Sequence, residues 1–203
     1  MNFKRVNFKR WIAVAACSAV LSVPLGSWGQ AEKPKPKLAT PNVPVPPATS
    51  LNALLSLLER EVVSAADAMP AEKYDFAPSG PGEFKGVRTF GEQVKHLAEA
   101  NYDFFDGWGI PGAVDSKTIE ALKSKDDIMK ALRDSYKYAH AAVDSITTEN
   151  AFLSLPAPEQ YKATRASMAA FCMAHSMDHY GQLVEYLRMN GIIPPASRKS
   201  SGM

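Results

Sequence analysis

Four long segments of the chain repeat apolar residues at intervals of three and four, the spacing that places side chains on one face of an α-helix. The helices that they predict span 51–69, 89–108, 125–147, and from 158 or 159 to 190. The apolar face of the first segment consists of Leu51, Leu54, Leu55, Leu58, Val62 and Ala65. No stretch alternates apolar and polar residues in the manner of a strand. The pattern therefore predicts an all-α protein built as a four-helix bundle.

Proline and glycine mark the ends of these predicted helices. Pro70 stops the first helix, and the stretch 71–88 that follows contains two prolines and three glycines. We therefore expect 71–88 to be a long crossing loop. A second glycine- and proline-rich run follows residue 106, and the link 115–124 after it has room for about one helical turn.

The first 31 residues have the organisation of a secretory signal peptide. Four basic residues and no acidic residue precede the apolar run 11–23, and small residues surround a cleavage position near 29–31. The alternative, a membrane anchor, is disfavoured because the run is shorter than the roughly 20 residues that a spanning helix needs. A lipoprotein signal at Cys17 is a further alternative, but only six apolar residues would precede that cysteine. We expect the protein to be exported, to the periplasm or out of the cell.

Loss of the signal would change the charge balance of the protein. The full chain has 23 basic and 21 acidic residues, and removing the four basic residues of the signal leaves 19 against 21, a net charge of −2. This balance gives no basic surface for nucleic acid. Cys17 would also leave, so Cys172 would have no partner for an internal disulfide.

The stretch 32–50 contains six prolines, which prevent a helix and favour an extended backbone. We interpret it as a linker between the signal and a single domain at 51–195, which is long enough to build its own apolar core. Residues 196–203 are expected to form a disordered tail.

His175 and His179 lie four residues apart in the last predicted helix, so their side chains share one face, one turn apart. Two such imidazoles can hold one divalent metal at about 2.1 Å per nitrogen. The alternative is a pair of hydrogen-bonded core histidines, because this spacing is common. His96, at the margin of the apolar face of 89–108, is the best third ligand by position. His140 is more typical of a surface or hydrogen-bonded residue.

Other side chains near this pair have two interpretations each. Cys172 could coordinate the metal or fill a small apolar space in the core. Asp178 points about 100° away from His179 and could act as a base or support a ligand. Gln182 could orient a ligand or contact a neighbouring helix. Gly181 would let another backbone approach closely.

Three motifs in the chain resemble a known family. The run from His175 to Pro195, H-x3-H-x-G-Q-L-x2-Y-L-R-x2-G-x2-P-P, resembles the last helix of the DinB-like superfamily. The runs 68–78 (A-M-P-x3-Y-D-F-x-P) and 89–101 (T-F-G-E-Q-V-x-H-L-A-x-A-N) support the resemblance. It implies an up-up-down-down style bundle, commonly a homodimer. It also implies a divalent metal, usually zinc or nickel, whose ligands by motif position are His96, His175 and His179.

The resemblance leaves the reaction open. Some relatives transfer low-molecular-weight thiols, some isomerise or hydrolyse small molecules with the help of the metal, and many have no known activity. Export disfavours the thiol route because those thiols are mainly intracellular. The first hypothesis is a metal-dependent hydrolase or transferase acting on a small molecule. The second is a non-catalytic metal-binding or stress-related module, and the third is a metal-free bundle with ordinary core histidines. The only expected membrane contact is through the export signal.

Overall fold

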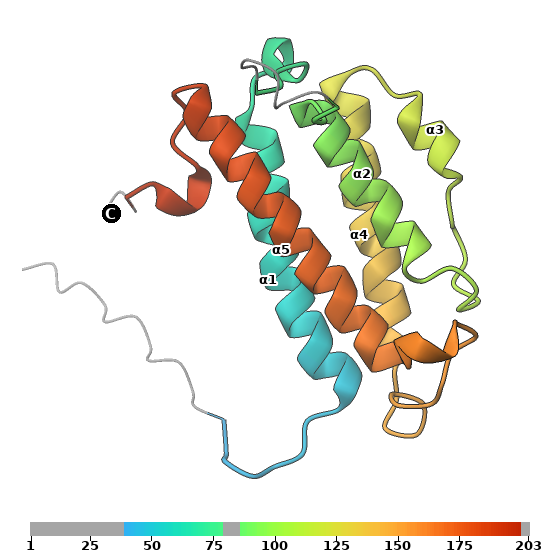
Figure 1. Cartoon of the computed structure of the whole chain (residues 1–203). Coiled ribbons are helices and arrows are strands. Elements are labelled where there is room, and N and C mark those ends of the chain that lie inside the picture. The colour runs from blue at the N-terminus through green and yellow to red at the C-terminus, as the bar shows by residue number, and fades with distance from the viewer. Residues whose placement is uncertain (1–38, 79–85, 200–203) are drawn as a thin grey trace, which may run out of the picture. The chain divides into compact units, whose positions relative to one another are not determined.

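Four long helices pack side by side to form a bundle (Figure 1). The computed structural model describes residues 39–78 and 86–199, and residues 42–199 belong to one folded unit. The long helices are α1 (Pro47–Ala68), α2 (Phe90–Asp103), α4 (Lys125–Asp144) and α5 (Arg165–Met189). The short elements are the helix α3 (Ser116–Glu120) and the 3₁₀ turns η1 (Ala71–Lys73), η2 (Glu159–Tyr161) and η3 (Pro195–Ser197). The described residues form no strand, which confirms the predicted all-α bundle.

The helix directions differ from the up-up-down-down order that we expected. Both α2 and α4 begin beside the end of α1: the backbone N–H of Gly91 donates to Tyr74 O at 2.8 Å, and Lys125 Nζ donates to Met69 O at 2.9 Å. The long helices therefore run up, down, down and up (Figure 1). Since α2 and α4 are parallel, the link 104–124, which carries α3, returns the chain along the bundle. The prediction that 71–88 crosses the bundle is wrong, because α2 begins beside Tyr74 and Phe76, at the same end of the bundle where α1 ends.

The last helix begins later than we predicted, at Arg165 instead of residue 158 or 159. Two features keep the preceding segment out of the helix. Ser154 pairs with Thr164 in an isolated antiparallel bridge, and Lys162 has a φ of 47°, a left-handed conformation that a right-handed helix cannot contain. The side chain of Thr164 then caps the first turn of α5.

Both ends of the folded domain also extend beyond the predicted bounds 51–195. α1 begins at Pro47, within the predicted linker, because proline suits the first turn of a helix, where its missing N–H is not needed. Order extends into the predicted tail, since η3 lies against α1 and Arg198 Nε donates to Ile193 O at 3.1 Å. The predicted signal, residues 32–38 of the linker and residues 200–203 lie outside the described residues. Among the described helices, none is both long enough and apolar enough to span a bilayer.

The apolar faces of the long helices meet in one core. Its largest fully buried side chains include Tyr136, Phe90, Phe105, Leu55, Met69 and Leu97. Leu54, which we expected on this face, is instead 47% exposed. A small polar group is also buried on α2, α4 and α5: Gln93, Asn101, Ser135, Ser176 and His179. Buried polar groups need partners, so this group directs attention to the space between α2 and α5.

Candidate metal centre

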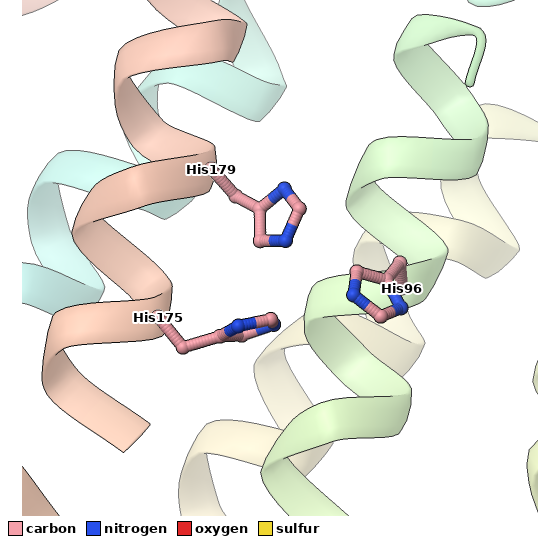
Figure 2. Close-up of side chains that lie close together, drawn as sticks. All are labelled: His96, His175 and His179. Atoms are coloured by element: carbon pink, nitrogen blue, oxygen red, sulfur yellow. The ribbon is translucent and has the colours of Figure 1, made fainter. Parts of the chain in front are cut away.

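Three histidines converge between α2 and α5. His175 and His179 project from successive turns of α5 toward His96 in the middle of α2 (Figure 2). One nitrogen of each ring can be chosen so that all three atoms lie within 4.8 Å of one another. The ring centroids are 4.5 to 5.1 Å apart. The fold thus brings together the three histidines that the sequence singled out.

The environment of His175 suits a ligand for a metal. Its Nε2 is buried and has no hydrogen-bond partner among the described residues. An unsatisfied buried nitrogen costs about 1–3 kcal/mol, so a bound species that accepts its lone pair would stabilise the site. Three imidazoles around a tetrahedral ion require nitrogen atoms roughly 3.4 Å apart, given bonds of about 2.1 Å.

All three imidazoles are shifted toward the neutral form. Burial lowers the pKa of His96 to about 4, and the Arg88 guanidinium and the other two imidazoles act in the same direction. Burial also lowers the pKa of His175 and of His179, against a smaller opposing effect of the Asp178 carboxylate. A metal binds the neutral imidazole, so the site keeps its ligands ready at neutral pH.

A series of hydrogen bonds, which we call the hydrogen-bond chain, links His179 Nδ1 through Gln93 and Gln182 to Asp178. Its Nδ1 lies 2.7 Å from Gln93 Oε1, and Gln93 Nε2 donates to Gln182 Oε1 at 2.7 Å. Gln182 Nε2 in turn donates to Asp178 Oδ2 at 3.0 Å. Such contacts orient metal ligands. Gln182 therefore takes both roles that we had considered for it, because it supports a ligand by contacting a neighbouring helix.

Gln93 is the residue that sequence reasoning missed. It is only 3% exposed, although glutamine is rarely buried. Its position three residues before His96 puts both side chains on one side of α2. A glutamine at that spacing within an apolar helix face was the signal that could have identified it.

Cys172 and Gly181 lie near the three histidines, but neither contributes to the site. Cys172 is buried outside the histidine group, its Sγ donates to Asn101 Oδ1 at 3.4 Å, and burial raises the pKa of its thiol to about 12. This matches the interpretation of Cys172 as a small core residue. Gly181 is exposed, and a Cβ added there would meet no atom within 4 Å. The close backbone approach that we expected at Gly181 is therefore absent within the described part of the chain.

His140 lies apart from the three histidines, between α4 and α1. Its Nδ1 is 2.6 Å from Asn52 Oδ1 and its Nε2 is 3.0 Å from Glu59 Oε2. Both ring nitrogens thus have oxygen partners. This confirms the interpretation of His140 as a hydrogen-bonded residue.

The site has an aromatic side and a polar side. The ring of Phe104 lies edge-on to His175, with centroids 5.2 Å apart, and Phe171 lies 6.4 Å from the same ring. On the other side His96 borders a surface cavity of about 600 Å³. Charged side chains line this cavity, namely Arg88, Glu92, Lys95, Glu99, Glu120 and Lys123. A polar small molecule could therefore reach His96 from solvent.

These features define a class of protein: a four-helix bundle whose second and last long helices present three histidines to one point. A model of the DinB superfamily matches residues 54–183, well over half of the chain. The chain belongs to the DinB superfamily. The matched segment contains all three histidines. No curated protein matches the chain.

Proposed function

We propose that this chain is an exported DinB-superfamily protein that binds zinc or nickel through His96, His175 and His179 and acts as a hydrolase or transferase on a small molecule. One observation carries the proposal: three imidazoles, each shifted toward the neutral form, converge around a buried nitrogen of His175 that has no other partner among the described residues.

The ligand set favours this kind of metal. Zinc and nickel accept imidazole nitrogen readily, whereas magnesium and calcium prefer oxygen. No carboxylate or thiol joins the three histidines within the part of the chain that the structure describes. Three protein ligands are typical of catalytic sites, which keep one coordination position for water or substrate. A divalent ion bound there would supply Lewis-acid chemistry, which both hydrolysis and group transfer can use.

The surrounding side chains suit a reaction on a polar small molecule. The cavity beside His96 offers a binding space, and the rings of Phe104 and Phe171 form an apolar border on the His175 side. Glu99 lines the cavity, with its Oε2 3.9 Å from His96 Nδ1. Burial raises the pKa of the Glu99 carboxyl, which makes it a better proton donor than an ordinary exposed glutamate carboxylate. We assign Glu99 the role of proton-transfer residue.

Export is supported by the basic and apolar pattern of residues 1–31 and by the small residues near 29–31. A homodimer is supported by the resemblance to the DinB-like superfamily, whose members are commonly dimeric. The net charge gives no reason to expect nucleic acid as a partner.

The test is turnover by the zinc- or nickel-loaded protein, screened against esters, amides and thiol acceptors. The wild type is compared with Glu99→Gln and with Glu185→Gln, which changes an exposed carboxylate on α5. We expect turnover by the wild type and the Glu185 variant, and a loss of about 10²–10⁴-fold in Glu99→Gln. Full metal loading without turnover on any substrate would contradict catalysis and favour the non-catalytic metal-binding module.

A further inference from the structure

We propose that Asp178 sets the direction of the hydrogen-bond chain through Gln182 and Gln93, and that this direction selects the tautomer of His179 that leaves Nε2 free for the metal. The inference deepens the proposed function and rests on its metal site. It makes Asp178 a positioning residue, and it replaces the role of general base that we had considered for Asp178.

The direction follows from the chemistry of the end group. An ionised carboxylate only accepts hydrogen bonds, whereas a side-chain amide donates through nitrogen and accepts through oxygen. The Gln182 amide must therefore turn its Nε2 toward Asp178, as observed at 3.0 Å. Its Oε1 then faces Gln93 and accepts from Gln93 Nε2 at 2.7 Å.

The same rule carries the direction to His179. Because Gln93 uses its Nε2 on Gln182, its Oε1 faces His179 Nδ1, at 2.7 Å. An oxygen acceptor there requires hydrogen on Nδ1. A neutral imidazole carries only one N–H, so Nε2 keeps its lone pair. Nε2 is then the nitrogen available to the metal.

Without a carboxylate at position 178, the donors and acceptors of these hydrogen bonds could exchange roles. If Gln182 and Gln93 both turned their amides around, Gln93 Nε2 would donate to His179 Nδ1, and the ring hydrogen would move to Nε2. The hydrogen bonds that join His179 Nδ1, Gln93 and Gln182 would all still form, so the burial of these groups does not favour either direction. The charge of Asp178, which lies on the exposed side of α5, breaks this symmetry without touching the ring.

The experiment compares the wild type with Asp178→Asn, Gln93→Leu and the double variant. The tautomer of His179 is read from the ¹⁵N chemical shifts of its ring in metal-free protein at neutral pH. Zinc affinity is measured by competition with a chromophoric chelator. Glu185→Gln is the matched control, because Glu185 is an exposed carboxylate on the same helix that pairs with Arg188.

We expect the wild-type ring to carry hydrogen on Nδ1 and the Asp178→Asn ring to be a mixture of tautomers. Zinc affinity should fall about 10-fold in Asp178→Asn and about 10–100-fold in Gln93→Leu. Asp178→Asn should add nothing in the Gln93→Leu background, because the chain that transmits its effect is gone. The Glu185 control should match the wild type in both measurements.

Hydrogen on Nε2 in the wild-type ring would overturn the proposal. The proposal would also be overturned if Asp178→Asn lowered zinc affinity equally in the wild-type and Gln93→Leu backgrounds. The carboxylate would then act directly through its charge and not through the hydrogen bonds. Since Asp178 is exposed, its variant folds regardless of what Gln93→Leu does. A wild-type ring with hydrogen on Nδ1 in a protein that binds no zinc would support the hydrogen-bond chain and contradict the proposed metal site, so the two failures are distinguishable.

Discussion

Two regions of this bundle use histidine in opposite ways. Between α1 and α4, both nitrogens of His140 lie against oxygen atoms, those of Asn52 and Glu59. Between α2 and α5, His96 and His175 face other imidazoles, and the buried Nε2 of His175 has no partner among the described residues. A histidine whose nitrogens are both bonded joins two helices. Where a buried histidine nitrogen has no such partner, a species bound between the rings would stabilise the arrangement.

The largest expected effect of this difference is on metal affinity. Because His175 offers a buried nitrogen that no other described residue uses, His175→Ala should lower zinc affinity by more than about 100-fold, beyond the range seen for residues that only support a ligand. His140→Ala should leave the affinity unchanged. Competition with a chromophoric chelator measures both, and an equal loss in the two variants would erase the distinction between the regions.

Thermal stability should separate the regions next. Zinc at 100 times its dissociation constant should stabilise the wild type by about 2.7 kcal/mol, because the metal binds the folded state only. Chelation should remove this increment in the wild type and in His140→Ala. The double variant His175→Ala/His179→Ala should show no response to zinc or chelator in a calorimetric melt. A zinc increment in that double variant would place the metal elsewhere.

The pH dependence of the metal-free protein offers a third comparison. The pKa of His96 is about 4 in the folded protein and about 6.5 in the unfolded chain, so between these values the unfolded state binds more protons. The free energy of unfolding should therefore fall as the pH drops from 6.5 toward 4, by about 1–2 kcal/mol after allowing for partial exposure of the ring.

His96→Gln should make this part of the stability curve less steep, although the lowered pKa values of His175 and His179 leave some slope. Urea titrations at pH 4.5 and pH 7 measure the slope in both proteins. An unchanged slope in His96→Gln would show that another group controls the pH dependence.

The smallest effect is expected at His140 itself. His140→Ala should lower the free energy of unfolding by about 1 kcal/mol, because its hydrogen bonds to Asn52 and Glu59 are only partly buried. The loss should be the same with and without zinc. A loss that appears only with zinc present would link His140 to the metal site.

Sequence patterns predicted the fold because they depend on neighbours along one helix. Apolar residues at spacings of three and four identified all four long helices, and the His175–His179 pair followed from the same periodicity. His96 required the additional step of judging which side of its helix faces the interior. The structure brings all three together as that reasoning expected.

The features that the sequence did not reveal depend on contacts between distant segments. The late start of α5 comes from the pairing of Ser154 with Thr164, which no helical periodicity encodes. The helix directions follow from contacts between distant segments, such as the hydrogen bond from Lys125, at the start of α4, to Met69, just after the end of α1. Gln93 gains its role only because α5 places His179 and Gln182 within hydrogen-bond distance of it.

The most direct test of the central claim is elemental analysis of purified residues 32–203 beside the His175→Ala/His179→Ala variant. We expect close to one zinc or nickel ion per chain in the wild-type protein and almost none in the variant, with circular dichroism showing both to be helical. Absence of metal from both proteins, even after loading with zinc and nickel, would contradict the claim that the three histidines form a metal centre.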